Sequence, residues 1–276
     1  LMIPILNNSG KVIAFGGRLI GEGNPKYLNS PETFLFHKSK QLFGVMNAKK
    51  YLNNKRLVVC EGYMDVISLT SHGYPAVASL GTALTENQIE NIFNISDEAF
   101  LVFDGDNAGQ NATLRVFEKY LPNLKLNKKL KFVFLPDRLD PEEFINKNGL
   151  NEFEKILDGA MGALDMIWMQ GLKKIKEHDP ESHALFWDYL RSKVNLIENI
   201  NIKQAFRDEI EKRIKLFRKK NSNPFNKSNN LEVFNYNLFS IKRNLPKTGI
   251  EIKIGAIIYI MLLSPRMSLE FDEKIS

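Results

Sequence analysis

The segment RLVVCEGYMD, from Arg56 to Asp65, runs from an apolar stretch into two carboxylates that flank a glycine turn. A segment of the same design, AFLVFDGDNAG, occupies residues 99–109. Continuous apolar runs are typical of strands in a parallel sheet, and open sheets of this kind place their ligands at the carboxyl ends of the strands. The two segments therefore predict neighbouring strands whose ends bring several acids into one pocket.

Around these segments, short apolar runs alternate with helical periodicity. The pattern predicts strands at residues 57–60, 76–79, 100–103 and 131–135, and helices that begin near Met64, Thr85 and Asn107. The helix at Thr85 starts with a capping-box sequence, TENQ. Alternation of this kind predicts right-handed βαβ crossovers and a parallel sheet.

The regions on either side of this core have different patterns. A hairpin is expected at residues 2–20, then a polar loop without periodicity, GEGNPKYLNSPET, and then a helical pattern from Lys38 to Leu52. After Phe144 the strand pattern ends. Residues 151–220 are helical in pattern, with an apolar stripe at Ile202, Phe206, Ile210, Ile214 and Phe217.

The composition limits the class of protein. With 43% hydrophobic and 25% charged residues, the 276-residue chain is expected to be an ordinary globular protein, and its net charge of +6 favours an anionic partner. The single cysteine, Cys60, excludes an internal disulfide and a multi-cysteine zinc site, and a cytoplasmic location is expected. The longest apolar run, residues 254–263, has about half of the ~20 residues that span a bilayer, so no membrane association is expected.

Carboxylates at the predicted strand ends are the candidate reactive groups. Asp104 and Asp106 project to the same side of an extended backbone, and Glu61 ends a neighbouring strand. Closely spaced carboxylates repel one another unless cations neutralise them, and Mg²⁺ prefers such oxygen ligands. Alternatively, these acids only cap helices and occupy turns, and for Asp65 both interpretations stay open.

The pair of motifs EGYMD, residues 61–65, and DGD, residues 104–106, resembles the TOPRIM domain. That domain is shared by type IA and type II topoisomerases, bacterial primases, RecR-type recombination proteins and some nucleases. Other segments resemble the bacterial DNA primase core in particular: IAFGGR at 13–18, PKYLNSPET at 25–33, FHK at 36–38, ASLGT at 78–82 and LPDRLDPEE at 135–143.

The resemblance implies an α/β fold, with a TOPRIM-type parallel sheet flanked by helices, preceded by part of an α+β subdomain and followed by a helical bundle. The implied divisions are the C-terminal part of the primase N-terminal catalytic subdomain (1–52), the TOPRIM domain (53–147), a helical subdomain of the polymerase core (148–220), an Asn/Ser-rich linker (221–248) and the start of a truncated C-terminal helicase-binding region (249–276).

The resemblance also assigns roles to residues. Glu61 matches the family glutamate that acts as an acid/base or metal-linked group, and Asp104 and Asp106 match the catalytic, metal-binding DxD. Asp140 and Glu142, the other two implied metal ligands, stand where the family usually has D-P-D; the second acid is longer by a methylene, and metal ligation is expected to survive that change. The implied template and nucleotide contacts are Arg18, Lys26, Tyr27 and Lys38, and the implied supporting residues are Gly62, Asp65, Gly81 and Gly105.

The activity implied is template-directed synthesis of short RNA primers on single-stranded DNA from nucleoside triphosphates, with Mg²⁺ or Mn²⁺ and no zinc in this chain. A replicative helicase and a single-strand binding protein are expected partners of the full-length protein. Because the chain lacks Met at position 1, we expect a piece of a longer protein. Two alternatives stay open: a TOPRIM-type nuclease or topoisomerase, and a non-catalytic single-stranded DNA-binding module.

Overall fold

The computed structural model describes residues 1–53, 55–81, 83–176 and 179–221, all within one compact unit. The predicted C-terminal region at 249–276 and nearly all of the predicted linker lie outside the described residues. Among the helices in the described ranges, none combines the length and the hydropathy of a membrane-spanning segment.

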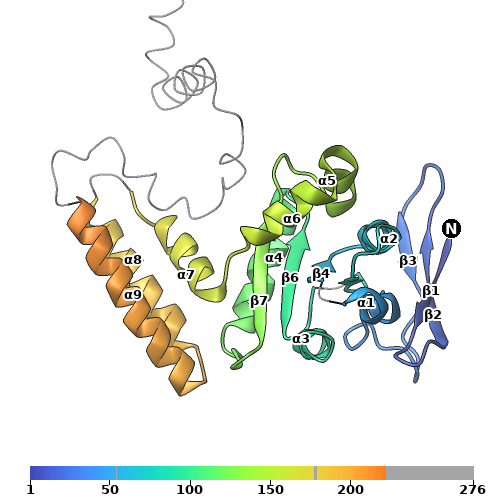
Figure 1. Ribbon diagram of the computed structural model, residues 1–276, viewed down its shortest axis with the longest axis horizontal. Helices are drawn as coiled ribbons and strands as arrows, with labels where there is room; N and C mark the ends of the chain where they lie inside the picture. The colour runs from blue at the N-terminus through green and yellow to red at the C-terminus, as the bar shows by residue number, and fades with distance from the viewer. Residues whose placement is uncertain (54, 82, 177–178, 222–276) are drawn as a thin grey trace, which may run out of the picture. The chain divides into compact units, whose positions relative to one another are not determined.

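A four-stranded parallel sheet forms the centre of the structure (Figure 1). Its strands are β4 (Leu57–Cys60), β5 (Ala76–Ala78), β6 (Glu98–Phe103) and β7 (Lys129–Phe134), in the order β5-β4-β6-β7. Every residue of β4 is fully buried, as expected for an apolar strand covered on both faces. The four predicted strands and their parallel arrangement are confirmed, with ends that differ by one or two residues.

The strand order creates a switch point in the sheet. Helix α2 (Tyr63–Ser71) leads from β4 to β5, whereas α4 (Asn107–Tyr120) leads from β6 to β7 in the other direction. Helix α3 (Glu86–Phe93) joins the two halves and begins with the predicted capping box of Thr85 and Gln88. Because β4 and β6 are neighbours whose connections diverge, a crevice is expected at their carboxyl ends.

Helices cover both faces of the sheet. On one face, Phe117 of α4 meets Phe132 of β7 edge to face, with ring centroids 5.6 Å apart. On the other, α2 packs with α5 (Pro141–Asn148) and α6 (Leu150–Asp158), where Phe153 is fully buried and contacts Tyr74. Burial of these large side chains is the main favourable contribution to folding.

An antiparallel three-stranded sheet precedes the parallel one. The predicted hairpin is confirmed as β1 (Met2–Leu6) and β2 (Val12–Arg18). A third strand, β3 (Tyr27–Asn29), pairs with β2 inside the stretch that the sequence predicts to be a loop, so that prediction is wrong there. Three residues are too few to show a period of two, and their strand conformation depends on pairing with residues 16–18.

The first helix is shorter than predicted. Helix α1 spans Val45–Tyr51, and the chain from Lys38 to Gly44 is not helical. Phe43 and Ala78 exchange backbone hydrogen bonds, which attaches this segment to the end of β5. Gly44 has φ of 86°, and a Cβ there would lie 2.7 Å from the carbonyl oxygen of Ala76, so the close approach requires glycine.

Helices alone follow the parallel sheet within the described residues, as the sequence predicts. After α5 and α6 come α7 (Ala163–Leu172), α8 (Pro180–Asn195) and α9 (Ile200–Asn221), and the last two lie side by side in Figure 1. The predicted apolar stripe of α9 is confirmed, because Ile210, Ile214 and Phe217 are all less than 10% exposed and belong to the main core.

Candidate functional site

Glu61 and Asp104 flank the switch point of the sheet. Glu61 directly follows β4 and Asp104 directly follows the neighbouring strand β6. The pKa of Glu61 is raised to about 7 by burial and by the charges of Asp104 and Asp106, while a hydrogen bond from the Asp104 backbone and the charge of Arg115 oppose the rise. These interactions place the predicted acids of two strands in one electrostatic environment.

One oxygen of the Glu61 carboxylate has no partner. Its Oε1 is buried and accepts no hydrogen bond within the described part of the chain. A buried acceptor without a partner is unfavourable, and a divalent cation beside it would remove the penalty. Glu61 therefore fits the role of a metal ligand.

The DGD turn holds Asp104 and Asp106 in different ways. Asp106 is the N-cap of α4, and its carboxylate accepts a hydrogen bond from the Gly109 amide at 2.8 Å. The pKa of Asp104 is raised by burial and by the carboxylates of Asp140 and Asp106. Capping therefore describes Asp106, whereas Asp104 caps no helix and faces the other acids.

Two glycines let the backbone close tightly around this turn. A Cβ on Gly105 would lie 2.6 Å from the carbonyl oxygen of Leu135, which belongs to the segment after β7. A Cβ on Gly109 would overlap the carbonyl group of Asp104. The site therefore requires residues without side chains at both positions.

The remaining acids lie at the N-termini of α2 and α5. Asp140 caps α5 by accepting a hydrogen bond from the Glu143 amide at 2.7 Å, and Glu142 follows in the first turn. Asp65 is 7% exposed and accepts a bond from the Gly62 amide at 3.2 Å. The pKa of Asp65 is raised to about 7 by burial and by the charges of Asp140 and Asp104.

Asp65 thus connects two parts of the site. A hydrogen bond from the Glu142 backbone opposes the rise of its pKa, so its carboxylate lies between the starts of α2 and α5. This placement fits the supporting role expected for Asp65 and Gly62. It also brings the predicted D-P-E segment next to the EGYMD segment.

Arg18 and Tyr27 reach the acids from the N-terminal sheet. The Arg18 guanidinium lies over the Tyr27 ring, 5.4 Å from its centroid. The pKa of Tyr27 is raised by burial, lowered by Arg18, and raised again by the charges of Asp65, Glu142 and Asp140. These two predicted nucleic-acid contacts therefore stand beside the acidic group.

The structure gives less support for the other two predicted basic residues, Lys26 and Lys38, as parts of the site. Lys26 is exposed, and its side chain forms no ion pair with another described residue. Lys38 is half-buried, and its backbone is fixed by Glu32 and by the Gln88 side chain, which donates to the Lys38 carbonyl at 2.9 Å. Their roles stay predictions.

Asn29 fastens the N-terminal sheet to the parallel sheet. Its Nδ2 donates to the Leu80 carbonyl at 3.0 Å, and its Oδ1 accepts from the Tyr63 hydroxyl. Gly81 lies next to this contact with φ of 75°, a conformation that favours glycine. Sequence reasoning missed Asn29, and a signal was its place in PKYLNSPET, one of the motifs that resemble primase.

Two arginines near the acids were also missed. Arg115 of α4 lowers the pKa of Glu61, and Arg138 lies in the segment between β7 and α5. Arg138 stands inside LPDRLDPEE, but Arg115 belongs to no motif, and only the fold shows that it faces Glu61.

The acids do not form a closed metal site. Among the described residues, no three His, Cys, Asp or Glu side chains are grouped as a ready-made set of ligands. Mg²⁺ commonly takes only one or two carboxylates from a protein and completes its shell with waters and substrate oxygens. Glu61, Asp104 and Asp106 are the residues that could hold such an ion.

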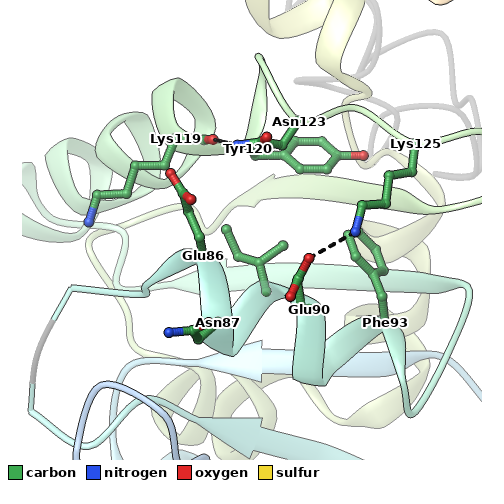
Figure 2. Close-up of a pocket in the computed structure, with 9 residues that line it drawn as sticks. Glu86, Asn87, Glu90, Phe93, Lys119, Tyr120, Asn123 and Lys125 are labelled. Carbon is green, nitrogen blue, oxygen red and sulfur yellow. Dashed lines mark hydrogen bonds and ion pairs between the residues drawn. The ribbon is translucent and has the colours of Figure 1, made fainter. Parts of the chain in front are cut away.

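A separate pocket lies between α3 and α4, with a volume of about 140 Å³ (Figure 2). It contains Phe93 and Tyr120, and an ion pair of 3.0 Å between Lys125 and Glu90 crosses it. None of the predicted site residues lines this pocket, so it is not the candidate site.

Burial of Glu61 and the repulsion from neighbouring acids should make the metal-free protein less stable as the pH rises. Because the pKa of Glu61 is raised from 4.5 to about 7, the folded state holds a proton that the unfolded state releases between these values, so stability falls over this range and levels off above it. After allowance for solvent screening, we expect Tm in EDTA to drop on the order of 5 °C between pH 4.5 and 7.5.

The Asp104→Asn variant should show a smaller drop in Tm, and added Mg²⁺ should make the drop smaller in the unsubstituted protein. Glu211 is an exposed carboxylate of α9, so the control variant Glu211→Gln should show the same drop as the unsubstituted protein. Calorimetry at several pH values measures the effect. The part of the drop that comes from burial should remain in Asp104→Asn, and a drop of undiminished size would contradict the predicted repulsion.

Comparison with known proteins identifies families and solved structures that this chain resembles in sequence and fold. The family model for the DNA primase catalytic core, N-terminal domain, matches residues 1–49, and a Toprim-like model matches residues 58–145. A solved structure of the DnaG primase catalytic domain bound to ssDNA is 36% identical, with a TM-score of 0.69, and the match covers 76% of this chain and 69% of that one. A DNA primase domain from Pseudomonas aeruginosa is 35% identical, with a TM-score of 0.70, over 76% and 67%.

Similarity extends to a full-length relative. The DNA primase of Rickettsia felis is 41% identical over 209 residues, which are 75% of this chain and 35% of that protein. The chain thus spans about a third of the length of this curated relative.

Proposed function

Because the chain belongs to the DnaG-type family of bacterial DNA primases, we propose that it provides the site of nucleotidyl transfer in template-directed primer synthesis. The observation that carries the proposal is the buried Glu61 carboxylate oxygen without a partner, beside Asp104 at the switch point of the sheet. An acidic group of this kind suits the metal-dependent joining of nucleotides.

The proposed cofactor is Mg²⁺ or Mn²⁺, held by Glu61, Asp104 and Asp106, with Asp140 and Glu142 as the further ligands that the resemblance implies. When bound, such an ion polarises a phosphoryl oxygen and stabilises the developing negative charge. The chain itself would position these ligands, since the Asp106 side chain caps α4 and the two turn glycines allow the DGD backbone to pack closely against its neighbours.

The proposed contacts to the template and the incoming nucleotide are Arg18, Tyr27, Lys26 and Lys38. Tyr27 is 38% exposed, so part of its ring is free to stack on a base, and the Arg18 guanidinium over it can bind a phosphate. Both stand beside the acids, and this arrangement would bring a template strand and its growing primer to the proposed metal site.

The substrates proposed are single-stranded DNA and nucleoside triphosphates, and the product is an RNA primer. The ssDNA in the related primase structure supports a DNA template. The predicted divisions at residues 52, 147 and 220 stay proposals, as do the cytoplasm as location and the helicase and single-strand binding protein as partners of the full-length protein.

A primer-synthesis assay tests the proposal. The chain is incubated with a single-stranded template, labelled nucleotides and Mg²⁺ or Mn²⁺, with an EDTA control. Labelled RNA that disappears with EDTA is the expected result. Template nicking without synthesis would replace the proposal with TOPRIM-type cleavage, and template binding without either reaction, with a strong salt dependence, would indicate a binding module.

A further inference from the structure

The segment between β7 and α5 contains two adjacent residues in the left-handed backbone region. Asp137 and Arg138 both have φ of 58°. In the described part of the chain, Asn127 is the only other residue besides glycine with positive φ. Side chains other than glycine rarely adopt this conformation, and it is found disproportionately at functional sites.

Arg138 packs directly against the DGD turn. The Gly105 amide donates to the Leu139 carbonyl at 2.9 Å, and a Cβ built on Gly105 would lie 3.1 Å from the Cα of Arg138. Two residues after Arg138, Asp140 begins α5. The strained segment therefore places an arginine between the two acidic motifs.

The guanidinium of Arg138 is available to a ligand. It is exposed and forms no hydrogen bond or ion pair with another residue in the described ranges, whereas its neighbour Asp137 pairs with Lys147 at 3.7 Å. A guanidinium is always charged and binds phosphate oxygens in a bidentate manner. A free arginine beside a group of carboxylates fits a ligand that carries phosphates to that group.

The position of Arg138 after the edge strand β7 favours one kind of ligand. Arg18 and Tyr27 come from the N-terminal sheet, which is fastened to the segment after β5, while Arg138 follows β7 at the opposite edge. Arg18 and Tyr27 therefore approach the acids from the N-terminal sheet, and Arg138 approaches them from the segment after β7. We propose that Arg138 binds the triphosphate of the incoming nucleotide, and this inference rests on the proposed function.

Equilibrium binding measurements can distinguish the effect of the Arg138 charge on nucleotide affinity from the effect of its backbone conformation. A fluorescent, non-hydrolysable ATP analogue with Mg²⁺ is titrated with the whole chain, with Arg138→Gly and with Asp137→Gly as matched control. Glycine adopts positive φ readily, so both variants should melt at or above the midpoint of the unsubstituted chain. Only Arg138→Gly should weaken binding of the analogue, on the order of tenfold, and Arg138→Lys should restore part of the loss.

The same proteins are titrated with a labelled single-stranded oligonucleotide, whose affinity should be equal in all of them. The inference is overturned if Arg138→Gly binds the analogue normally, if Asp137→Gly loses as much affinity, if the oligonucleotide alone is affected, or if the unsubstituted chain binds no analogue. The binding measurement does not require synthesis. If the chain makes no primer but its binding of the analogue depends on Arg138, that result contradicts the proposed function and leaves the inference on Arg138 standing.

Discussion

Glu61→Gln should abolish primer synthesis while the fold persists. The substitution keeps the size of the side chain but removes the negative charge at the switch point of the sheet. If Glu61 holds a divalent ion, its loss removes several kcal/mol of stabilisation from the transition state, so synthesis should fall roughly a thousandfold. Labelled primers resolved on a gel measure the rate, and circular dichroism checks the fold.

Glu118→Gln is the matched control, since Glu118 is an exposed carboxylate of α4 whose partner is Lys193. It should retain full activity. Titration with Mn²⁺ gives a second measurement that does not need turnover, and Glu61→Gln should bind the ion more weakly. Normal synthesis by Glu61→Gln would remove Glu61 from the catalytic site, and unfolding of this variant would instead assign it a structural role.

Gly109→Ala should disrupt the DGD turn itself. The added Cβ would overlap the Asp104 carbonyl oxygen and lie 2.9 Å from its carbonyl carbon, and both neighbours are backbone atoms that cannot rotate away. We expect a loss of about 3 kcal/mol or more in the free energy of unfolding, which is at the upper end for overpacking. We also expect Gly109→Ala to lose primer synthesis, because the overlap would displace Asp104.

Urea unfolding measures the stability of Gly109→Ala. Gly162→Ala serves as its control, because Gly162 also lies at the start of a helix but the nearest atom to its Cβ would be 3.6 Å away. The control should lose little stability. Equal losses in the two variants would indicate a general cost of alanine at helix starts and would contradict the tight packing of the turn.

The sequence predicts the parallel sheet well because its strands are local features. Each strand is a continuous apolar run that ends in turn residues, and this pattern needs no knowledge of the neighbouring strands. β3 and α1 were predicted poorly for the opposite reason. The strand β3 depends on pairing with β2, and the start of α1 is set by contacts of Phe43 and Gly44 with β5.

The candidate site likewise contains residues that the local sequence identifies and residues that only the folded structure reveals. The acids at the strand ends could be identified from spacing and resemblance, and the structure brings them into one electrostatic environment. Arg115 could not be identified, since it belongs to no motif and comes near Glu61 only because of the path of α4. Backbone strain at Arg138 was equally invisible, because φ depends on how the segment packs against Gly105.

The side chain of Asn29 joins the strand that carries Tyr27 to the segments that follow β4 and β5. Its two polar atoms are both occupied, and each partner belongs to a different segment. The Asn29 side chain, together with the apolar core that Tyr63 and Leu80 share with the N-terminal sheet, thus sets the distance between the residues proposed to bind the template and those proposed to perform chemistry. In mechanical terms Asn29 is a spacer, and it would fix which base of a bound template stands opposite the acids.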